Sequence, residues 1–148
     1  MLFDRMGEDV MQYVKRLDEM TKEEYQETGG KAANLGELIR HGFNVPGGFC
    51  VTGKSLDYLL EASGLESGIM EIVGTMNFDN YGDIENKSTQ IREMIADAAM
   101  PEDLLGEIKQ QIAGLKSPSG EEPFVAVRSS VAVKGSTISS FPGMMDTY

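Results

Sequence analysis

The sequence predicts an α+β fold in which a small, mostly antiparallel sheet packs against helices. Short β-type segments alternate with longer stretches whose apolar residues recur at helical spacing. Their order is strand, helix, strand, several helices, strand, loop and strand, which is typical of this class. The 148 residues, of which 41% are hydrophobic and 25% charged, suit one compact domain.

Two short strands are predicted in the first third of the chain, on either side of a helix. Residues 13–20 partly alternate between polar and apolar, and residues 49–52 follow a turn of proline and glycine. Cys50 lies in the second strand between apolar neighbours, which favours a buried and unreactive thiol. Because Cys50 is the only cysteine, an internal disulfide is excluded.

The intervening helix is predicted to begin after a pair of glycines. Thr21 and Glu24 first show the spacing of a capping box, which predicts a brief helical turn. The glycines at 29–30 then break the chain, and apolar residues at helical spacing predict a helix over 31–42 that ends at a glycine. Lys31 is therefore expected in the first turn of this helix.

The middle of the chain predicts four amphipathic helices. A loop over 75–82 separates the second from the third, and Pro101 suits the first position of the fourth. Apolar residues at helical spacing define the four faces. They are Leu56, Leu59 and Leu60; Leu65, Ile69, Ile72 and Val73; Ile91, Met94, Ile95 and Ala98; and Leu104, Leu105, Ile108, Ile112 and Leu115.

The end of the chain differs from the acidic helices before it. After a surface connection over 116–123, β-branched residues predict a strand over 124–128 that ends at Arg128. A loop rich in Ser, Thr and Gly follows, and residues 144–148 begin another strand. The formal net charge is −11, yet of the 24 acidic residues only Asp146 lies beyond this connection. The overall charge argues against nucleic-acid binding, and the least repulsive place for a polyanion is this last stretch.

Two separated features of the sequence could hold an anion. Lys31 adds an ammonium to a helix start, where free N–H groups and the dipole already attract negative charge. Arg128 precedes hydroxylic residues and glycines that let backbone N–H groups surround phosphate oxygens. Each feature also has a simpler interpretation, as a solvated lysine after a turn and as an ordinary flexible loop. Neither standard glycine-rich nucleotide motif occurs, and His41, the only histidine, is interpreted as a partner of the helix dipole.

Together the two features resemble a known family. Residues 29–53 (GGKAANLGELIRHGFNVPGGFCVTG) and 124–148 (FVAVRSSVAVKGSTISSFPGMMDTY) are similar to the two signature segments of the nucleotide-binding domain of phosphoenolpyruvate synthase and pyruvate phosphate dikinase. The resemblance implies that residues 1–148 are a single partial domain, the N-terminal part of an ATP-grasp domain. It implies that ATP phosphorylates a histidine on a separate swivelling domain, in the same or a partner chain. That histidine then passes the phosphate to pyruvate in a barrel domain.

The resemblance also implies which residues contact ATP. No catalytic residue and no metal ligand is assigned to this chain, and the acids that would hold magnesium are expected outside it. The isolated chain is therefore expected to bind ATP weakly or not at all and to have no turnover. The positions that match the family's phosphate contacts, or lie beside them, are Lys31, Arg128, Gly143, Met144, Asp146 and Thr147.

Several alternatives stay open at this point. From Arg128 to Phe141 the spacing resembles that of the synthases, whereas PGMMDT resembles the dikinases, so the sequence does not choose between the two. Lys134 departs from the synthases, which usually have an acid at this position. A related ATP-grasp phosphotransferase with another acceptor, such as rifampicin, a glucan or a phenol, fits equally. So does a standalone interaction module without catalysis, and an acidic domain that binds no nucleotide is a third possibility. Without an apolar run near the ~20 residues of a membrane helix, and without a signal-like N-terminus, we expect a cytoplasmic protein with no membrane partner.

Overall fold

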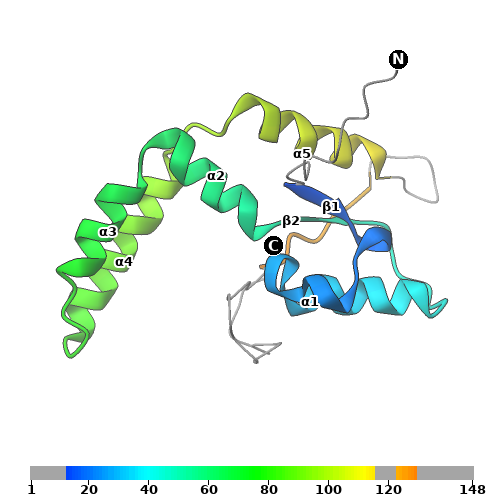
Figure 1. The fold of residues 1–148 in the computed structure, drawn as a ribbon, viewed down its shortest axis with the longest axis horizontal. Helices are drawn as coiled ribbons and strands as arrows, with labels where there is room; N and C mark the ends of the chain where they lie inside the picture. Colours follow the sequence, from blue (N-terminus) through cyan, green and yellow to red (C-terminus); the bar gives the residue numbers. More distant parts are fainter. Residues whose placement is uncertain (1–12, 116–122, 130–148) are drawn as a thin grey trace, which may run out of the picture.

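The computed structural model describes residues 13–115 and 123–129. The elements in chain order are β1 (Val14–Arg16), the 3₁₀ turns η1 (Leu17–Glu19) and η2 (Lys22–Glu24), α1 (Tyr25–Arg40), β2 (Phe49–Val51), α2 (Gly53–Ser63), α3 (Glu66–Gly74), α4 (Tyr81–Ala96) and α5 (Glu102–Gly114). Helices dominate, and the described residues contain one small antiparallel sheet, in agreement with the predicted α+β class (Figure 1). The assignment of residues 1–148 to a single ATP-grasp part stays a prediction.

The sheet consists of β1 and β2, in which Lys15 lies opposite Cys50. β1 is shorter than the strand predicted over 13–20. Directly after β1, the N–H of Leu17 donates to the carbonyl of Gly48 at 3.0 Å, and the chain then turns into η1. Leu17 is thereby buried in the core, so part of the apparent strand pattern belongs to a 3₁₀ turn.

The core lies between the sheet, the 3₁₀ turns and α1. Of the residues predicted to share the apolar face of this helix, Ala32, Leu35 and Ile39 pack onto this core, whereas Leu38 is exposed. α1 approaches so closely that a Cβ at Gly36 would lie 2.8 Å from the carbonyl oxygen of Met20. The buried members of the core and the two residues packed against them are Leu17, Met20, Ala32, Cys50, Leu35 and Ile39.

Two predicted local signals flank this region. Glu24 Oε2 accepts the backbone N–H of Thr21 at 2.9 Å, which confirms the capping box around the brief turn η2. After α1, Gly42 has a φ of 80°, as the predicted helix end requires. Its N–H and that of the next residue donate to the carbonyls of Ile39 and Leu38 at 2.9 and 3.0 Å. The chain is thus directed out of the helix and back toward β2.

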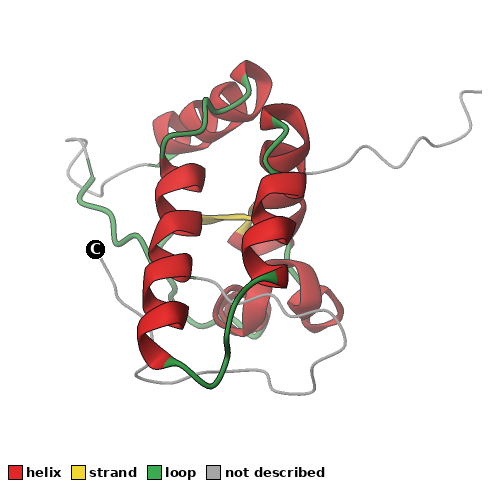
Figure 2. Ribbon diagram, turned by 90° about the vertical axis from the view of Figure 1, so that its left-hand side faces the viewer, coloured by secondary structure: helices red, strands yellow, loops and turns green. Residues whose placement is uncertain are grey.

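The four helices predicted in the middle of the chain are confirmed as α2 to α5. α3 and α4 lie side by side and run antiparallel, away from the sheet (Figure 1 and Figure 2). α5 returns to β1, where Leu104 is buried and Tyr58 of α2 donates its hydroxyl to Asp103 at 2.9 Å. Pro101 precedes α5 instead of occupying its first position, because its ψ of 138° is extended.

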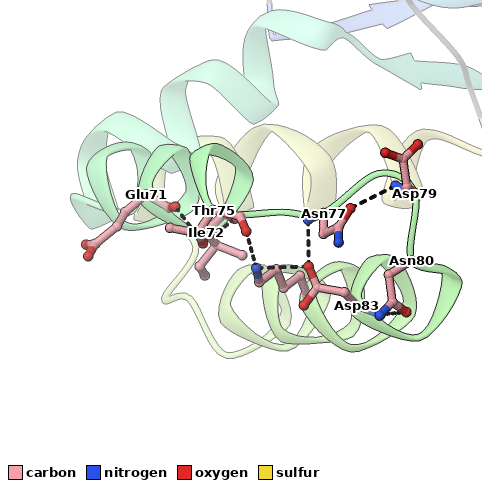
Figure 3. A network of polar contacts seen from close by, with 8 residues as sticks. Glu71, Ile72, Thr75, Asn77, Asp79, Asn80 and Asp83 are labelled. Carbon is pink, nitrogen blue, oxygen red and sulfur yellow. Dashed lines mark hydrogen bonds and ion pairs between the residues drawn. The ribbon is translucent and has the colours of Figure 1, made fainter.

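A polar network closes the connection between α3 and α4 (Figure 3). Asp83 accepts the backbone N–H of Asn77 at 2.7 Å and pairs with Lys87 at 3.0 Å. Lys87 also donates to the carbonyl of Thr75, just after α3. The loop ends two residues earlier than predicted, because the side chain of Asn80 caps α4 by accepting the N–H of Asp83 at 3.2 Å.

The last described segment differs from the prediction. Residues 124–128 do not form the predicted strand, and within them only Arg128 takes part in an isolated β-bridge. The side chain of Phe124 is fully exposed. β-branched residues favour a strand only where a partner pairs with it, so propensity alone was misleading here. The strand predicted at 144–148, the loop before it and the connection at 116–122 lie outside the described residues.

Candidate phosphate-binding site

The candidate site is built around a break in α1. Gly29 has φ 76° and ψ 156°, a backbone conformation that essentially only glycine adopts. The helix therefore starts afresh at Gly30, and Lys31 lies in its first turn, as predicted. Backbone N–H groups in the first turn of a helix have no partner within that helix. The break thus creates a second helix start inside α1, with a cation beside it.

The segment before the break is held by buried contacts. Thr28 is 1% exposed, and its Oγ1 donates to the carbonyl of Glu24 at 3.0 Å. The thiol of Cys50 lies 3.4 Å from the carbonyl of Thr28 and also 3.4 Å from that of Val51, so its single S–H is shared between two acceptors. Cys50 is buried as predicted, and its thiol supports the backbone directly before Gly29. The break is therefore anchored to β2.

Glu24 anchors the same segment from its other end. Its carboxylate binds the ammonium of Lys15 and the backbone N–H of Thr21. Partial burial would raise the pKa of Glu24, but these bonds outweigh burial and hold that pKa below its ordinary value. The carboxylate is therefore charged at neutral pH and stays paired with Lys15.

Lys31 connects the first turn after the break in α1 with the last described segment of the chain. Its Nζ donates to the carbonyl of Ser129 at 3.4 Å, a contact between residues 98 positions apart. Figure 1 shows the segment over 123–129, in orange, running toward the start of α1. Arg128 is exposed directly beside this contact. The structure thus brings Lys31 next to the segment that contains Arg128.

Lys31 and Arg128 differ from other cations of the described chain in their partners. Within residues 13–115 and 123–129, neither Lys31 nor Arg128 has a carboxylate within 4.0 Å, in contrast to Lys15 and Lys54. Two cations, together with the N–H groups of a first helical turn, can neutralise and orient a phosphate. This combination is what the chemistry of the site offers.

The other predicted site residues lie outside the described residues. These are Gly143, Met144, Asp146 and Thr147, whose roles stay predictions. In the described part of the chain, no group of three His, Cys, Asp or Glu side chains is arranged to hold a metal ion. His41 follows α1 as its C-cap residue, 3.9 Å from the carboxylate of Glu37, which places it where the dipole interpretation expects it.

The structure also contains a groove that the sequence did not predict. A groove of about 340 Å³ opens between β2, α2 and α5. The sequence predicted apolar faces on both helices, but it carried no signal for which faces would meet. The lining of the groove consists of Glu27, Val51, Thr52, Gly53, Ser55, Leu56, Leu59, Met100, Leu104 and Ile108.

None of the described helices is both long and apolar enough to cross a membrane.

Comparison with known proteins places this geometry in context. Residues 25–148 match the family model described as the pyruvate phosphate dikinase AMP/ATP-binding domain. A probable phosphoenolpyruvate synthase of Staphylothermus marinus is 37% identical over 139 residues, covering 92% of this chain and 17% of the relative. One of Methanocaldococcus jannaschii is 36% identical, covering 95% of this chain and 12% of the relative.

A bacterial relative gives the same result. The phosphoenolpyruvate synthase of Pseudomonas aeruginosa is 33% identical over 143 residues, covering 94% of this chain and 18% of the relative. The chain therefore spans less than a fifth of the length of these three relatives.

Proposed function

The chain belongs to the family of the pyruvate phosphate dikinase AMP/ATP-binding domain, and on that premise we propose that it holds the ATP phosphates in a phosphotransferase. In this proposal, ATP phosphorylates a histidine on a swivelling domain, which feeds the phosphate to pyruvate to make phosphoenolpyruvate. The acceptor domains belong to the same or a partner chain, in keeping with relatives that are several times longer.

One observation carries the proposal. The contact of Lys31 with the carbonyl of Ser129 joins the glycine-led helix start to the Arg128 segment. These are the two segments that independently suggested an anion site. Their meeting supports a shared role, because a triphosphate needs positive charge and N–H donors from more than one direction.

The chemistry assigned to the site is positioning and charge neutralisation. Lys31 and Arg128 would reduce the negative charge of the triphosphate, and the N–H groups after Gly29 would orient it for in-line transfer. Magnesium would accompany ATP and neutralise part of its charge, and the acids that would hold it are expected outside residues 1–148. Gly143, Met144, Asp146 and Thr147 are proposed to complete the phosphate loop.

The acceptor is proposed to be pyruvate. The matched relatives are named phosphoenolpyruvate synthases, which favours pyruvate over rifampicin, a glucan or a phenol. Residues 1–148 alone are proposed to bind ATP weakly or not at all and to have no turnover, because an ATP-grasp site is a cleft between two subdomains and these residues would provide one wall of it.

The test is a titration of ATP and magnesium into the complete protein and its variants. Lys31→Ala and Arg128→Ala should each weaken binding about tenfold or more, since each removes a charge-assisted contact. Lys109→Ala is the matched control, because it removes the same charge from an exposed site on α5 and should leave affinity unchanged. Wild-type affinity in both Lys31→Ala and Arg128→Ala would refute the assignment.

A further inference from the structure

One face of the two-stranded sheet supports the turn that precedes the break in α1. Lys15 and Cys50 lie directly opposite each other in the antiparallel register. Opposite residues of an antiparallel pair project from the same face. Lys15 binds the carboxylate of Glu24, and the thiol of Cys50 lies within 3.4 Å of the carbonyl of Thr28, which shares this donor with the carbonyl of Val51. One cross-strand pair therefore holds both ends of a single helical turn.

The held turn is itself closed by a hydrogen bond. Oγ1 of Thr28 donates to the carbonyl of Glu24 at 3.0 Å, so the two contact points are linked to each other. These contacts are partly shielded from solvent, because the side chains of Lys15 and Glu24 are 17% and 29% exposed and Cys50 is 7% exposed. Such contacts restrict the backbone more firmly than exposed surface pairs do.

The break after this turn makes such support necessary. Glycine has more backbone freedom than any other residue type, so Gly29 cannot by itself fix the direction of the helix that follows. On the far side, the helix is packed at Gly36 against the carbonyls of Met20 and Leu17. On the near side, the support comes from Lys15 and Cys50.

We propose that Lys15 and Cys50 are positioning residues that fix the direction of Lys31 toward bound phosphate. The inference rests on the proposed function of Lys31. Neither residue is assigned a contact with ATP, and each acts through the backbone from Glu24 to Gly29. This role predicts a dependence of ATP affinity on residues that belong to the sheet.

The main test compares Lys15→Met with Arg16→Met in the complete protein. Arg16 is the neighbouring cation of β1, and its exposed guanidinium pairs with Asp18 instead of the turn. Both variants remove one positive charge from the same strand, so a general effect on the anion ATP is matched. Lys15→Met should weaken the binding of ATP and magnesium about three- to tenfold, and Arg16→Met should not. Equal affinities of the two variants would overturn the inference.

A double-mutant cycle separates positioning from a merely structural role. If Lys15 acts through Lys31, then Lys15→Met should have little further effect on affinity in a Lys31→Ala background. Additive effects of the two substitutions would overturn the inference, even if each one alone weakens binding. Lys15→Arg, which retains the cation, should restore most of the affinity and guards against a folding defect of the methionine variant.

Cys50 supplies an independent comparison. Cys50→Ser keeps a donor for the Thr28 carbonyl, whereas Cys50→Ala removes it. Only the alanine variant should lose affinity, and equal affinities of the two would overturn the role of the thiol.

The variant Lys31→Ala distinguishes failure of the proposed function from failure of the present inference. If the proposed function is wrong, Lys31→Ala binds ATP as the wild type does. Failure of the present inference alone leaves the effect of Lys31→Ala intact.

Discussion

Gly36 shows how one residue sets the position of the candidate site. A Cβ at this position would lie 2.8 Å from the carbonyl oxygen of Met20 and 2.9 Å from that of Leu17. Both neighbours are backbone atoms, which cannot move without shifting the 3₁₀ turns. The absence of a side chain therefore lets α1 rest directly on the turn that follows β1.

We predict that Gly36→Ala lowers the free energy of unfolding by about 1–3 kcal/mol, as overpacking does. Gly106→Ala in α5 is the matched control, because its Cβ would meet nothing within 4 Å. That variant should gain about 0.5–1 kcal/mol from helix propensity. Urea denaturation of both variants checks the prediction, and equal changes would contradict it.

Gly29 illustrates a different use of glycine. Its conformation interrupts α1, whereas an uninterrupted helix would leave Lys31 in the middle of a helix without free N–H groups beside it. The interruption is supported by Thr28 and Cys50 on one side. At the scale of single residues, the site therefore depends on one backbone exception and on the contacts that hold it.

At the scale of elements, the connection between α3 and α4 depends on one carboxylate. Asp83 accepts the N–H of Asn77 and pairs with Lys87, and these bonds hold the pKa of Asp83 below its ordinary value of 3.8. A lowered pKa in the folded state means that the charged form stabilises the fold. This stabilisation is fully present above about pH 5 and is lost as the pH falls through 3.8 and below.

Hydrogen exchange can test this dependence. We expect the backbone N–H of Asn77 to lose protection as the pH is lowered below 4, after correction for the intrinsic exchange rate. Asp83→Asn should remove the protection already at neutral pH. Glu85→Gln, which removes the same charge from an exposed site on α4, should behave as the wild type. Full protection of Asn77 in Asp83→Asn would show that the carboxylate is not required.

Across the whole molecule, the antiparallel pair of helices α3 and α4 is joined to the sheet of β1 and β2 through α2 and α5 (Figure 1). α5 contacts β1, and Leu104 is its one fully buried residue in the described structure, with 2% of its surface exposed. By contrast, Ile112 of the same helix is 53% exposed. The attachment of α5 therefore depends mainly on its first turns.

We predict that Leu104→Ala lowers the free energy of unfolding by about 2 kcal/mol, near the lower end for a buried leucine. The groove beside Leu104 leaves part of its surroundings open, which is why a larger loss is not expected. Ile112→Ala should cost less than about 1 kcal/mol, because it removes little buried surface. Thermal unfolding of the complete protein measures both variants. A similar loss of stability in both would contradict the conclusion that α5 is attached mainly through its first turns.

Local signals in the sequence predicted most of the individual elements. The capping box of Thr21 and Glu24, the helix end at Gly42 and the existence of α2 to α5 each depend on residues a few positions apart, although Leu56, Val73 and Ile112 of the predicted faces are exposed. The same applies to Lys31, whose place in a first turn follows from the glycines directly before it. Hydrogen bonds and side-chain contacts of this short range leave a regular pattern in the chain.

Long-range pairing was decided by the tertiary structure. The register that sets Lys15 opposite Cys50, and the contact of Lys31 with Ser129, join residues far apart in the chain. The strand predicted over 124–128 was wrong for the same reason, since a strand needs continuous pairing and within this segment only Arg128 takes part in a bridge. Sequence patterns indicate which residues are apolar, charged or flexible. Which distant residue each of them contacts depends on how the whole chain packs.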